Sequence, residues 1–264
     1  MSLLAKAPNR IHGDMRLRSR KMKGKASRNK RERLQNAFLR DMGWKRWDVQ
    51  SKNIFNFLMS ASMNTLSTDI VLDLGAGQCR YKPFFEHARY IGVDFAKGSS
   101  KWDYSKLDVI ADISEIPFRD ESVDVAINTV TMEHVNEPQK MLKEIYRILK
   151  PDGNLFLYAP MAYPEHQIPF DYFRYTKYGL KYLFEKAGFE VKSISPSNGS
   201  FYTGAVWAAY PLQYIRNKFL RIAGFALFKY IIRPIANRLD GLDRDRNFPL
   251  VYVCYVQKRG RDNL

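Results

Sequence analysis

Cysteine is scarce in this sequence, and long apolar runs are absent. The 264 residues include two cysteines, Cys79 and Cys254, which lie far apart and form no CxxC pair. This spacing predicts neither a disulfide framework nor a zinc site, and it is typical of a reducing compartment. No uncharged apolar run reaches the roughly 18 residues of a membrane span, and no apolar segment follows the N-terminal basic residues as in a signal peptide. We therefore expect a cytoplasmic protein.

Acidic residues are also few. The chain has 27 Asp and Glu against 43 Lys and Arg, which gives a formal net charge of +16. Such a field favours anionic partners, namely nucleic acid, acidic lipid head groups or phosphorylated substrates. The first 33 residues hold twelve basic residues and two acids, and they have too little apolar surface to offset the entropy cost of ordering. We predict that residues 1–40 form a basic arm that is flexible or partly helical.

Apolar residues make up 45% of the chain, enough for one α/β domain with added segments. Residues 41–68 are predicted to be helical, because Ile54, Phe55 and Leu58 recur at helical spacing. Across residues 69–264, short apolar runs then alternate with helical stretches. The predicted strands are Ile70–Leu74, Tyr90–Val93, Asp108–Ala111, Val123–Asn128, Asn154–Ala159, Phe189–Ile194 and Val251–Gln257, and the predicted helices are Pro138–Leu149 and Thr176–Ala187. This alternation predicts a doubly wound, mostly parallel sheet that binds ligands beyond the carboxyl ends of its strands.

The segment with the clearest chemistry is Val71-Leu72-Asp73-Leu74-Gly75-Ala76-Gly77, a buried strand followed by a glycine-rich turn. Glycines allow unusual dihedrals and a close approach of backbone to ligand. About twenty residues later, Asp94 ends the next strand, where a carboxylate can accept hydrogen bonds from both hydroxyls of a ribose. Each feature alone is common. Together, in this order, they favour a cofactor that carries a nucleoside.

Further segments follow in a characteristic order: Asp112-Ile113, Pro117–Val125, Glu133-His134-Val135 and Leu149–Leu155. From Ile70 to about Phe189, this ordered set resembles the class I S-adenosylmethionine-dependent methyltransferases, in particular the type 11 subgroup. The resemblance implies a Rossmann-like fold with seven strands, the last of them antiparallel, and S-adenosyl-L-methionine as cofactor. A nicotinamide-dependent dehydrogenase is disfavoured, because it should have a third glycine at the helix start to admit the pyrophosphate, and because the turn Leu149–Gly153 before the fifth strand is less typical of it.

The resemblance also implies roles for individual residues. Asp73, Gly75 and Gly77 would form the loop under the methionine part of the cofactor, and Asp94 would hold the ribose. Asp112 and Ile113 would flank the adenine, while Asn128 and Thr129 would border the sulfonium and the acceptor pocket. Many relatives have a third glycine where this chain has Cys79. This difference bears on the expected shape of the turn and not on the expected cofactor.

Methyl transfer from a sulfonium is a direct displacement, so we expect no metal to be required, and a base only for a poorly ionised acceptor. The predicted substrate loop is Tyr163–Thr176. There His166 would act as an acceptor-side base or ligand, and Arg174 would hold an anionic group of the acceptor, with Asp171 and Tyr175 also on the substrate side. Equally, Asp171 and Arg174 could form a structural ion pair and Thr176 an N-cap. His134 is a second catalytic candidate, and the alternative is that it packs the loop.

A helical insertion is predicted at about residues 201–245. It is rich in aromatic and basic residues, and no acid occurs between Phe201 and Leu239. This composition favours a membrane-surface element or a lid over an apolar substrate; the alternative is a helix pair covering the sheet edge, with its basic residues extending to water.

Three functions stay open at this level. The first is a methyltransferase for a small-molecule or lipid-linked acceptor, glycan-like or quinone-like, acting at an anionic inner membrane face. The second is an RNA methyltransferase that holds phosphates with the basic arm. The third is a non-catalytic binding protein on the same fold, which the near-complete cofactor motif disfavours. The oligomeric state is not indicated.

Overall fold

A seven-stranded mixed sheet forms the centre of the protein. The computed structural model describes residues 25–41, 49–98 and 101–260. The strands are β1 Ile70–Leu74, β2 Arg89–Asp94, β3 Val109–Ile110, β4 Val123–Thr129, β5 Leu149–Pro160, β6 Phe189–Pro196 and β7 Val251–Lys258. Their order is β3-β2-β1-β4-β5-β7-β6, with β7 antiparallel to both neighbours and every other pair parallel. The predicted Rossmann-like sheet with an antiparallel last strand is confirmed.

The strand order places the ligand site. From β1 the chain runs outward through β2 and β3, and then returns to β4 on the other side of β1. The loops that leave β1 and β4 therefore diverge in opposite directions and open a crevice beyond the carboxyl ends of these strands. Leu74, Asp94 and Thr129 end β1, β2 and β4 at this edge.

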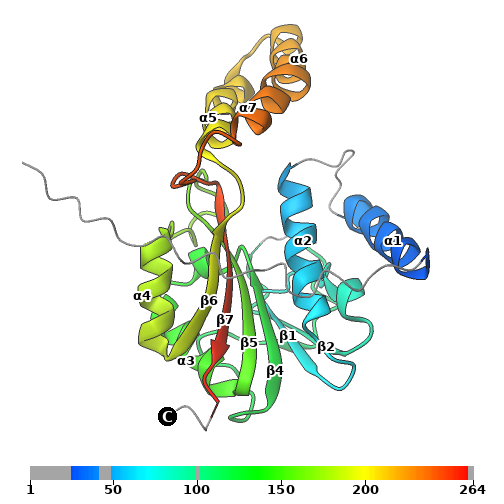
Figure 1. The fold of residues 1–264 in the computed structure, drawn as a ribbon, viewed down its shortest axis with the longest axis vertical. Helices are drawn as coiled ribbons and strands as arrows, with labels where there is room; N and C mark the ends of the chain where they lie inside the picture. The colour runs from blue at the N-terminus through cyan, green and yellow to red at the C-terminus, as the bar shows by residue number, and fades with distance from the viewer. Residues whose placement is uncertain (1–24, 42–48, 99–100, 261–264) are drawn as a thin grey trace, which may run out of the picture.

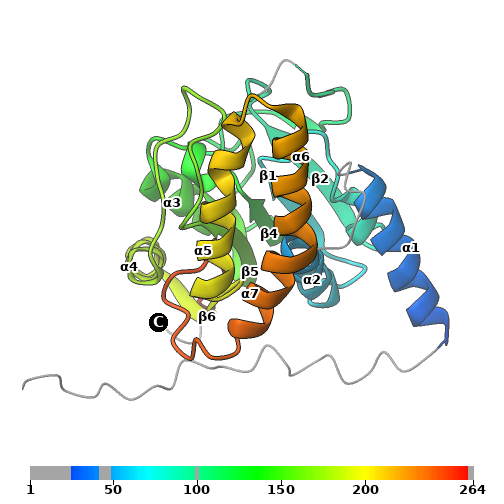
Figure 2. The same cartoon turned by 90° about the horizontal axis from the view of Figure 1, so that it is seen from above.

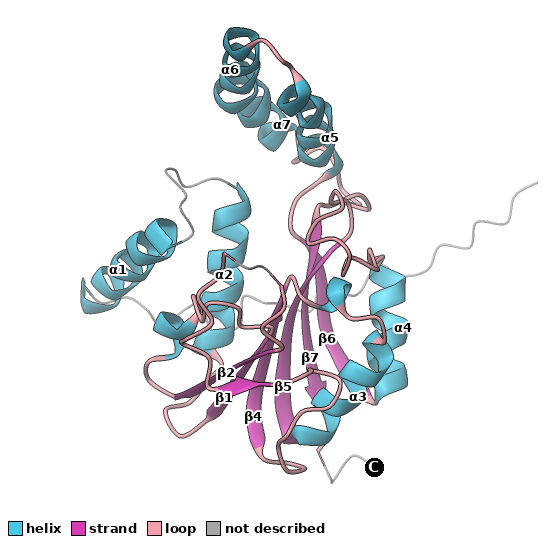
Figure 3. Ribbon diagram, turned by 180° about the vertical axis from the view of Figure 1, so that it is seen from behind, coloured by secondary structure: helices cyan, strands magenta, loops and turns pink. Residues whose placement is uncertain are grey.

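Helices cover both faces of the sheet (Figures 1 and 3). Helices α3 (Pro138–Ile148) and α4 (Lys177–Ala187) pack on one face, and α1 (Lys25–Asp41) and α2 (Val49–Met63) on the other. Alternate residues of a strand point to opposite faces. In β1, Leu72 and Leu74 accordingly enter the cluster under α3 and α4, whereas Val71 enters the cluster under α1 and α2.

Helix α1 makes the second part of the predicted basic arm helical, which is one of the two conformations that the sequence left open. Residues 25–41 are helical, and Leu34 and Phe38, four residues apart on one helix face, are buried. The Phe38 ring lies 6.0 Å from that of Phe55 in α2 and 5.8 Å from that of Phe84. The high density of basic residues hid this short apolar stripe in the sequence. The remainder of the predicted arm, residues 1–24, and residues 42–48 of the predicted helical segment lie outside the described residues.

Two predicted boundaries are confirmed in detail. Thr176 caps α4, since its hydroxyl accepts a hydrogen bond from the Gly179 amide at 3.1 Å, and Gly188 ends the helix with φ 102°. Helix α3 ends at Ile148, one residue before the predicted end, and a tight turn follows: Asp152 takes φ 63°, and a β-carbon on Gly153 would lie 2.8 Å from the Lys150 carbonyl oxygen. The chain thus turns sharply into the main part of β5.

Helices α5 (Ser200–Ala209), α6 (Lys218–Leu227) and α7 (Arg233–Leu239) form the predicted insertion between β6 and β7. It lies beyond one end of the sheet (Figure 1), and α5 runs beside α6 and α7 (Figure 2). Asp240 and Asp243 accept hydrogen bonds from the first backbone amides of α5 at 2.6–2.8 Å, so the two ends of the insertion are joined. None of the helices in the described residues is long and apolar enough to cross a membrane.

Candidate functional site

The glycine-rich turn after β1 has no room for a side chain at residue 75. Gly75 has φ 82° and Gly77 φ 52°. The amides of Gly75 and Ala76 both donate to the Val93 carbonyl oxygen, at 2.8 and 3.1 Å, which folds the turn against β2. A β-carbon on Gly75 would lie 2.2 Å from Thr131 Oγ1. Because φ is positive and the space is filled, an L side chain at residue 75 is excluded on two counts.

Asp94 ends β2 directly beside this turn. Its Oδ2 accepts a hydrogen bond from the Gly77 amide at 2.9 Å, and its Oδ1 accepts one from the Ala96 amide at 2.8 Å. Each carboxylate oxygen has two lone pairs, so each keeps capacity for a further donor. The turn and the carboxylate predicted to hold the nucleoside are therefore joined in one unit.

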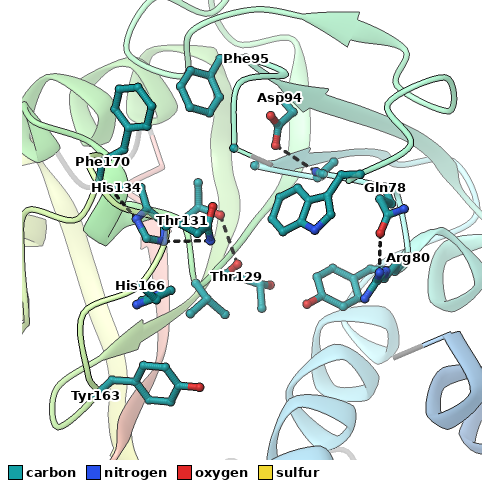
Figure 4. Close-up of a pocket in the computed structure, with 18 residues that line it drawn as sticks. Gln78, Arg80, Asp94, Phe95, Thr129, Thr131, His134, Tyr163, His166 and Phe170 are labelled. Carbon is teal, nitrogen blue, oxygen red and sulfur yellow. Dashed lines mark hydrogen bonds between the residues drawn. The ribbon is translucent and has the colours of Figure 1, made fainter. Parts of the chain in front are cut away.

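Two adjoining cavities, of about 280 and 210 Å³, form a cleft at the carboxyl edge of the sheet (Figure 4). Six residues line both of them: Gly75, Asp94, Phe95, Thr131, His134 and Phe170. The larger cavity also contacts Gly77, Thr129, Tyr163 and His166, and the smaller one contacts Asp112 and Ile113. The cleft thus brings together most of the residues that the sequence predicted for the cofactor, as well as both predicted catalytic histidines.

Asp112 lies in the smaller cavity with its charge stabilised. Burial alone would raise its pKa, but hydrogen bonds from the hydroxyl and amide of Ser114, at 2.5 and 2.8 Å, bring the pKa below the ordinary value. Both bonds fall on Oδ1. The side chain is therefore an ionised acceptor, as recognition of an adenine amino group requires, and Ile113 supplies the apolar contact beside it.

Asp73 and Asn128 lie behind the wall of the cleft and line neither cavity. Asp73 points to the α1–α2 face, where its Oδ2 accepts a hydrogen bond from the Tyr90 hydroxyl at 2.5 Å; burial raises its pKa to about 7. Asn128 donates to the Leu74 carbonyl oxygen at 2.9 Å and so ties β4 to β1. Asn128 thus holds the residue directly before the glycine turn, and direct contact with the cofactor stays a prediction for both side chains.

Thr129 faces the larger cavity with an unsatisfied group. Its side chain is buried, and its hydroxyl oxygen has no hydrogen-bond partner among the described residues. Together with the Gly75 turn and the ionised Asp112, this unpartnered hydroxyl shows that the cleft suits a ligand with a ribose, an adenine and a polar tail. The expected cofactor therefore fits the residues that are present.

The substrate loop is organised by an ion pair. Arg174 contacts both carboxylate oxygens of Asp171, at 2.6 and 2.7 Å, and also donates to the carbonyl oxygens of Tyr163 and Pro164 at 2.8 Å. Its hydrogen bonds hold the pKa of Asp171 down at about 2. The alternative interpretation, a structural pair, is thus present in the protein, and recognition of an acceptor by Arg174 stays a prediction. Tyr175 is buried, and its hydroxyl donates to the Met132 carbonyl oxygen at 3.0 Å.

The two predicted catalytic histidines meet at the cleft wall, with ring centroids 4.7 Å apart. His166 lies between two carboxylates: its Nε2 is 3.7 Å from Glu133 Oε1, and its Nδ1 is 3.5 Å from Asp171 Oδ2. The interaction with Glu133 raises the pKa of His166 above the ordinary value, in spite of partial burial. Because both ring nitrogens face protein oxygens, the geometry gives little support to a general base that acts alone.

The sequence-based predictions did not include Arg80 or Trp102, which line the cleft, or give a role to Glu133, which lies behind the histidines. Gln167 and Phe170 also line the cleft; they lie within the predicted substrate loop but had no role of their own. Arg80 donates a hydrogen bond to Gln78 and lies three residues after Gly77, so a cation close to the Gly-x-Gly motif was a signal in the sequence. Trp102 has no such signal, because the loop between β2 and β3 brings it to the site.

Cys79 replaces the third glycine of many relatives at little cost. It takes φ 53°, a conformation that glycine prefers, and its thiol donates to the Lys106 carbonyl oxygen at 3.2 Å. A β-carbon on Gly92 would lie 2.5 Å from its Sγ, so Gly92 makes room for the thiol. Burial raises the pKa of Cys79 to about 11. The side chain is therefore a neutral packing group rather than a nucleophile.

Comparisons with known proteins agree with this geometry. Residues 72–157 match the type 11 family model described as "Methyltransferase domain". The chain is similar to a demethylmenaquinone methyltransferase of Clavibacter sepedonicus, with 28% identity over 188 residues, which cover 67% of this chain and 74% of that protein. It is also similar to a protein of the same name from Renibacterium salmoninarum, with 33% identity over 121 residues, covering 43% of this chain and 49% of that protein.

Among solved structures, the fold is similar to that of a methyltransferase in complex with the Haloferax volcanii Trm112 methyltransferase activator. The TM-score is 0.53 at 19% identity, and the match covers 88% of this chain and 98% of that chain. At this identity the likeness concerns the fold alone.

Proposed function

We propose that this chain, a class I S-adenosylmethionine-dependent methyltransferase of the type 11 group, methylates an amphiphilic, lipid-linked acceptor at an anionic membrane surface. The observation that carries the proposal is the position of the exposed, cationic insertion α5–α7 at the same edge of the sheet as the cofactor cleft. The non-catalytic alternative is not retained, because the chain is an enzyme of this family.

The residues that line the cofactor end of the cleft are sufficient to bind S-adenosyl-L-methionine. Gly75 and Gly77 provide the surface of the turn, Asp94 accepts from the ribose hydroxyls, and Asp112 accepts from the adenine. When bound, S-adenosyl-L-methionine supplies a methyl group that its sulfonium has already activated. What remains for the protein is to exclude water and to hold the acceptor atom in line with that methyl group, at about 3 Å.

The acceptor end of the cleft adjoins the insertion. Tyr163 lines the larger cavity, and the preceding residue, Ala162, accepts a hydrogen bond from Trp207 of α5 at 3.3 Å. Since β6 is parallel to β5, α5 leaves the sheet at the carboxyl edge, where the cleft opens. An acceptor that rests on the insertion thus has a short path to the cavity.

The insertion exposes far more apolar surface than a water-facing helix pair needs. The helix α6 and the π-helical turn after it have no buried residue, and α7 buries only Ala236. The side chains of Phe219, Leu220 and Ile222 are 83%, 63% and 56% exposed. Exposed apolar patches of this kind mark contacts with other proteins, ligands or membranes.

The charge around these side chains supports an anionic membrane as the partner of this surface. Residues 201–239 contain no acid and six basic residues: Arg216, Lys218, Arg221, Lys229, Arg233 and Arg238. Apolar side chains inserted among lysines and arginines are typical of an element that lies in the interface of an anionic bilayer. Each basic residue near such a surface adds about 1 kcal/mol of attraction, which salt weakens.

Two acceptor classes fit this arrangement, a quinone-like ring and a polyprenyl-linked glycan intermediate. The relatives named demethylmenaquinone methyltransferase favour a quinone-like acceptor. Either one offers a polar head for the cavity beside Thr129 and His166 and an apolar tail for the insertion.

The direct test supplies the enzyme with radiolabelled S-adenosyl-L-methionine and with lipid, glycan and RNA fractions of the source cell. We expect label in the lipid fraction and stronger transfer when that fraction is in anionic vesicles. Label confined to RNA would instead establish the RNA methyltransferase alternative, with the basic arm holding phosphates.

Vesicle sedimentation tests the surface itself. The protein is expected to bind phosphatidylglycerol vesicles at low salt, to bind phosphatidylcholine vesicles weakly, and to lose binding in the double variant Phe219→Ser/Leu220→Ser. Leu66→Ser is the matched control, because Leu66 is 65% exposed but lies beyond α2, before β1. Equal binding by the control and the double variant would contradict the proposed surface.

A further inference from the structure

Glu133, His134 and His166 converge on one point behind the cleft wall. Glu133 Oε1 lies 3.8 Å from His134 Nε2 and 3.7 Å from His166 Nε2, and the ligand atoms of all three residues lie within 4.8 Å of one another. Glu133 and His134 are the last two residues of the short helix Met132–His134 after β4, and His166 lies in the substrate loop after β5. Figure 4 shows His134 and His166 side by side at the cleft.

Glu133 is the unusual member of this cluster. Its side chain is completely buried, and neither carboxylate oxygen accepts a hydrogen bond from the described residues. A buried carboxylate is costly unless it is paired with a cation or bound to a metal. Its nearest cationic candidates are the two imidazoles, both with Nε2 toward the same oxygen.

Each imidazole is oriented through its other nitrogen. His134 Nδ1 lies 2.6 Å from the Phe170 carbonyl oxygen, and His166 Nδ1 lies 3.2 Å from the Pro164 carbonyl oxygen. A carbonyl oxygen only accepts, so Nδ1 carries the proton and donates in both rings, and in the neutral form of each imidazole Nε2 keeps a lone pair for a metal ion. Histidines that bind metals are held in this way, with the second ring nitrogen donating to a carbonyl or carboxylate oxygen.

We propose that Glu133, His134 and His166 bind a divalent first-row transition metal ion, with zinc as the reference case. Two imidazoles and one carboxylate form a common ligand set for such ions. Metal–ligand bonds near 2.0–2.1 Å at tetrahedral angles separate the ligand atoms by about 3.4 Å. The separations of 3.7 and 3.8 Å are close to this value. Because His134 and His166 also line the larger cavity, the remaining coordination position would be accessible from the cleft.

This inference rests on the proposed function and narrows its substrate class to an acceptor with a hydroxyl group. A bound ion lowers the pKa of a coordinated hydroxyl, which releases its proton to water. The oxygen then forms the bond to the methyl carbon while the carbon–sulfur bond breaks and leaves its electron pair on sulfur. The displacement at the methyl carbon needs no metal. The only effect of the ion would be to lower the pKa of the acceptor hydroxyl.

A metal-free arrangement competes with the metal site. In it His166 is an imidazolium that neutralises Glu133, and His134 Nε2 accepts a hydrogen bond from the Gln167 amide nitrogen, 3.2 Å away. The two arrangements differ in whether the native protein takes up an ion, so metal binding decides between them.

The experiment uses the untagged full chain, freed of metal by a chelator and then titrated with Co²⁺. We expect one equivalent to bind, with visible absorption bands of a nitrogen- and oxygen-bound ion, and Zn²⁺ to displace it. Glu133→Gln and His166→Gln should each weaken Co²⁺ binding by at least ~10-fold. His87→Gln is the matched control, because His87 lies before β2 with its Nε2 3.2 Å from the Thr65 carbonyl oxygen, and it lines neither cavity.

Calorimetry with S-adenosyl-L-methionine accompanies each titration and reports whether each variant is folded. No stoichiometric Co²⁺ uptake by the wild-type chain, or equal affinity in all three variants, overturns the metal site and leaves the proposed function intact if the cofactor binds. Co²⁺ binding that depends on Glu133 supports the site even if no lipid acceptor is methylated, so the two proposals fail separately.

Discussion

Gly75 and Thr131 lie in contact across the cofactor cleft, and the space between them has no room for one more carbon. A β-carbon on Gly75 would lie 2.2 Å from Thr131 Oγ1 and 2.7 Å from Thr131 Cβ. Thr131 is itself held by a hydrogen bond from its hydroxyl to the Thr129 carbonyl oxygen at 3.1 Å (Figure 4). The shape of the turn is therefore determined by a contact between the loops after β1 and β4.

Gly75→Ala is expected to reduce cofactor affinity by at least ~10-fold, because the turn must move and its φ of 82° is unfavourable for alanine. Gly204→Ala in α5 is the control: nothing lies within 4 Å of its β-carbon position, so we expect unchanged affinity and a gain of up to ~1 kcal/mol in stability. Isothermal calorimetry and urea unfolding measure the two quantities. Equal affinities would show that the turn tolerates a side chain.

Asp94→Asn should weaken cofactor binding by ~10–100-fold, since a neutral amide makes weaker hydrogen bonds to ribose hydroxyls than a carboxylate does. The unfolding free energy should change less, because the amide oxygen still accepts from the Gly77 or the Ala96 amide. Calorimetry with S-adenosylhomocysteine, which lacks the reactive methyl group, gives the affinity. Wild-type affinity in the variant would show that Asp94 does not bind the ribose hydroxyls.

The Asp171–Arg174 pair is expected to stabilise the substrate loop. Arg174→Gln breaks five hydrogen bonds, two to Asp171 and three to the carbonyl oxygens of Tyr163, Pro164 and Phe173. Charge-assisted bonds of this kind contribute about 1.5–3 kcal/mol each. We expect a lower unfolding free energy and a raised KM for the acceptor, with cofactor affinity retained. A double-mutant cycle with Asp171→Asn measures the coupling; zero coupling would leave Arg174 free for an anionic acceptor.

Asp73 makes stability depend on pH in a defined direction. Burial raises its pKa from 3.8 to about 7, so the folded state holds this proton more tightly than the unfolded state. Its contribution to stability therefore falls as the pH rises from about 4 to 7. Relative to wild type, Asp73→Asn should gain on the order of 1–3 kcal/mol between pH 5 and pH 8. Urea unfolding of both proteins across this range gives the difference, and a flat difference would contradict the raised pKa.

Helix α1 should contribute to stability. Phe38 is 3% exposed against Phe55 and Phe84, so Phe38→Ala is expected to lower the unfolding free energy by about 3 kcal/mol. Phe219→Ala, at a side chain that is 83% exposed, is the matched control and should change it by less than ~0.5 kcal/mol. Similar changes of the unfolding free energy in the two variants would show that the packing of α1 does not stabilise the fold.

Local pattern was sufficient for the fold and for the cofactor half of the site. Strand–helix alternation predicted the sheet, and the glycines of Gly75-Ala76-Gly77 with Asp94 and Asp112 predicted residues that line the cleft. These predictions succeed because each depends on a short segment whose backbone conformation is dictated by its own residues. They are incomplete where segments meet: Asp73 was assigned to the cofactor, but strand alternation turns its side chain toward Tyr90, so this role stays a prediction.

The sequence by itself determined the order of strands and helices, the glycine turn and the basic, acid-free insertion, because composition and periodicity are properties of consecutive residues. Only the tertiary structure decided that the carboxylate of Glu133 would be buried beside His134 and His166, and that Trp207 would join the insertion to the cleft loop. Contacts between residues so far apart arise when the sheet brings the carboxyl ends of its strands to one edge, and no local pattern encodes which loops meet there.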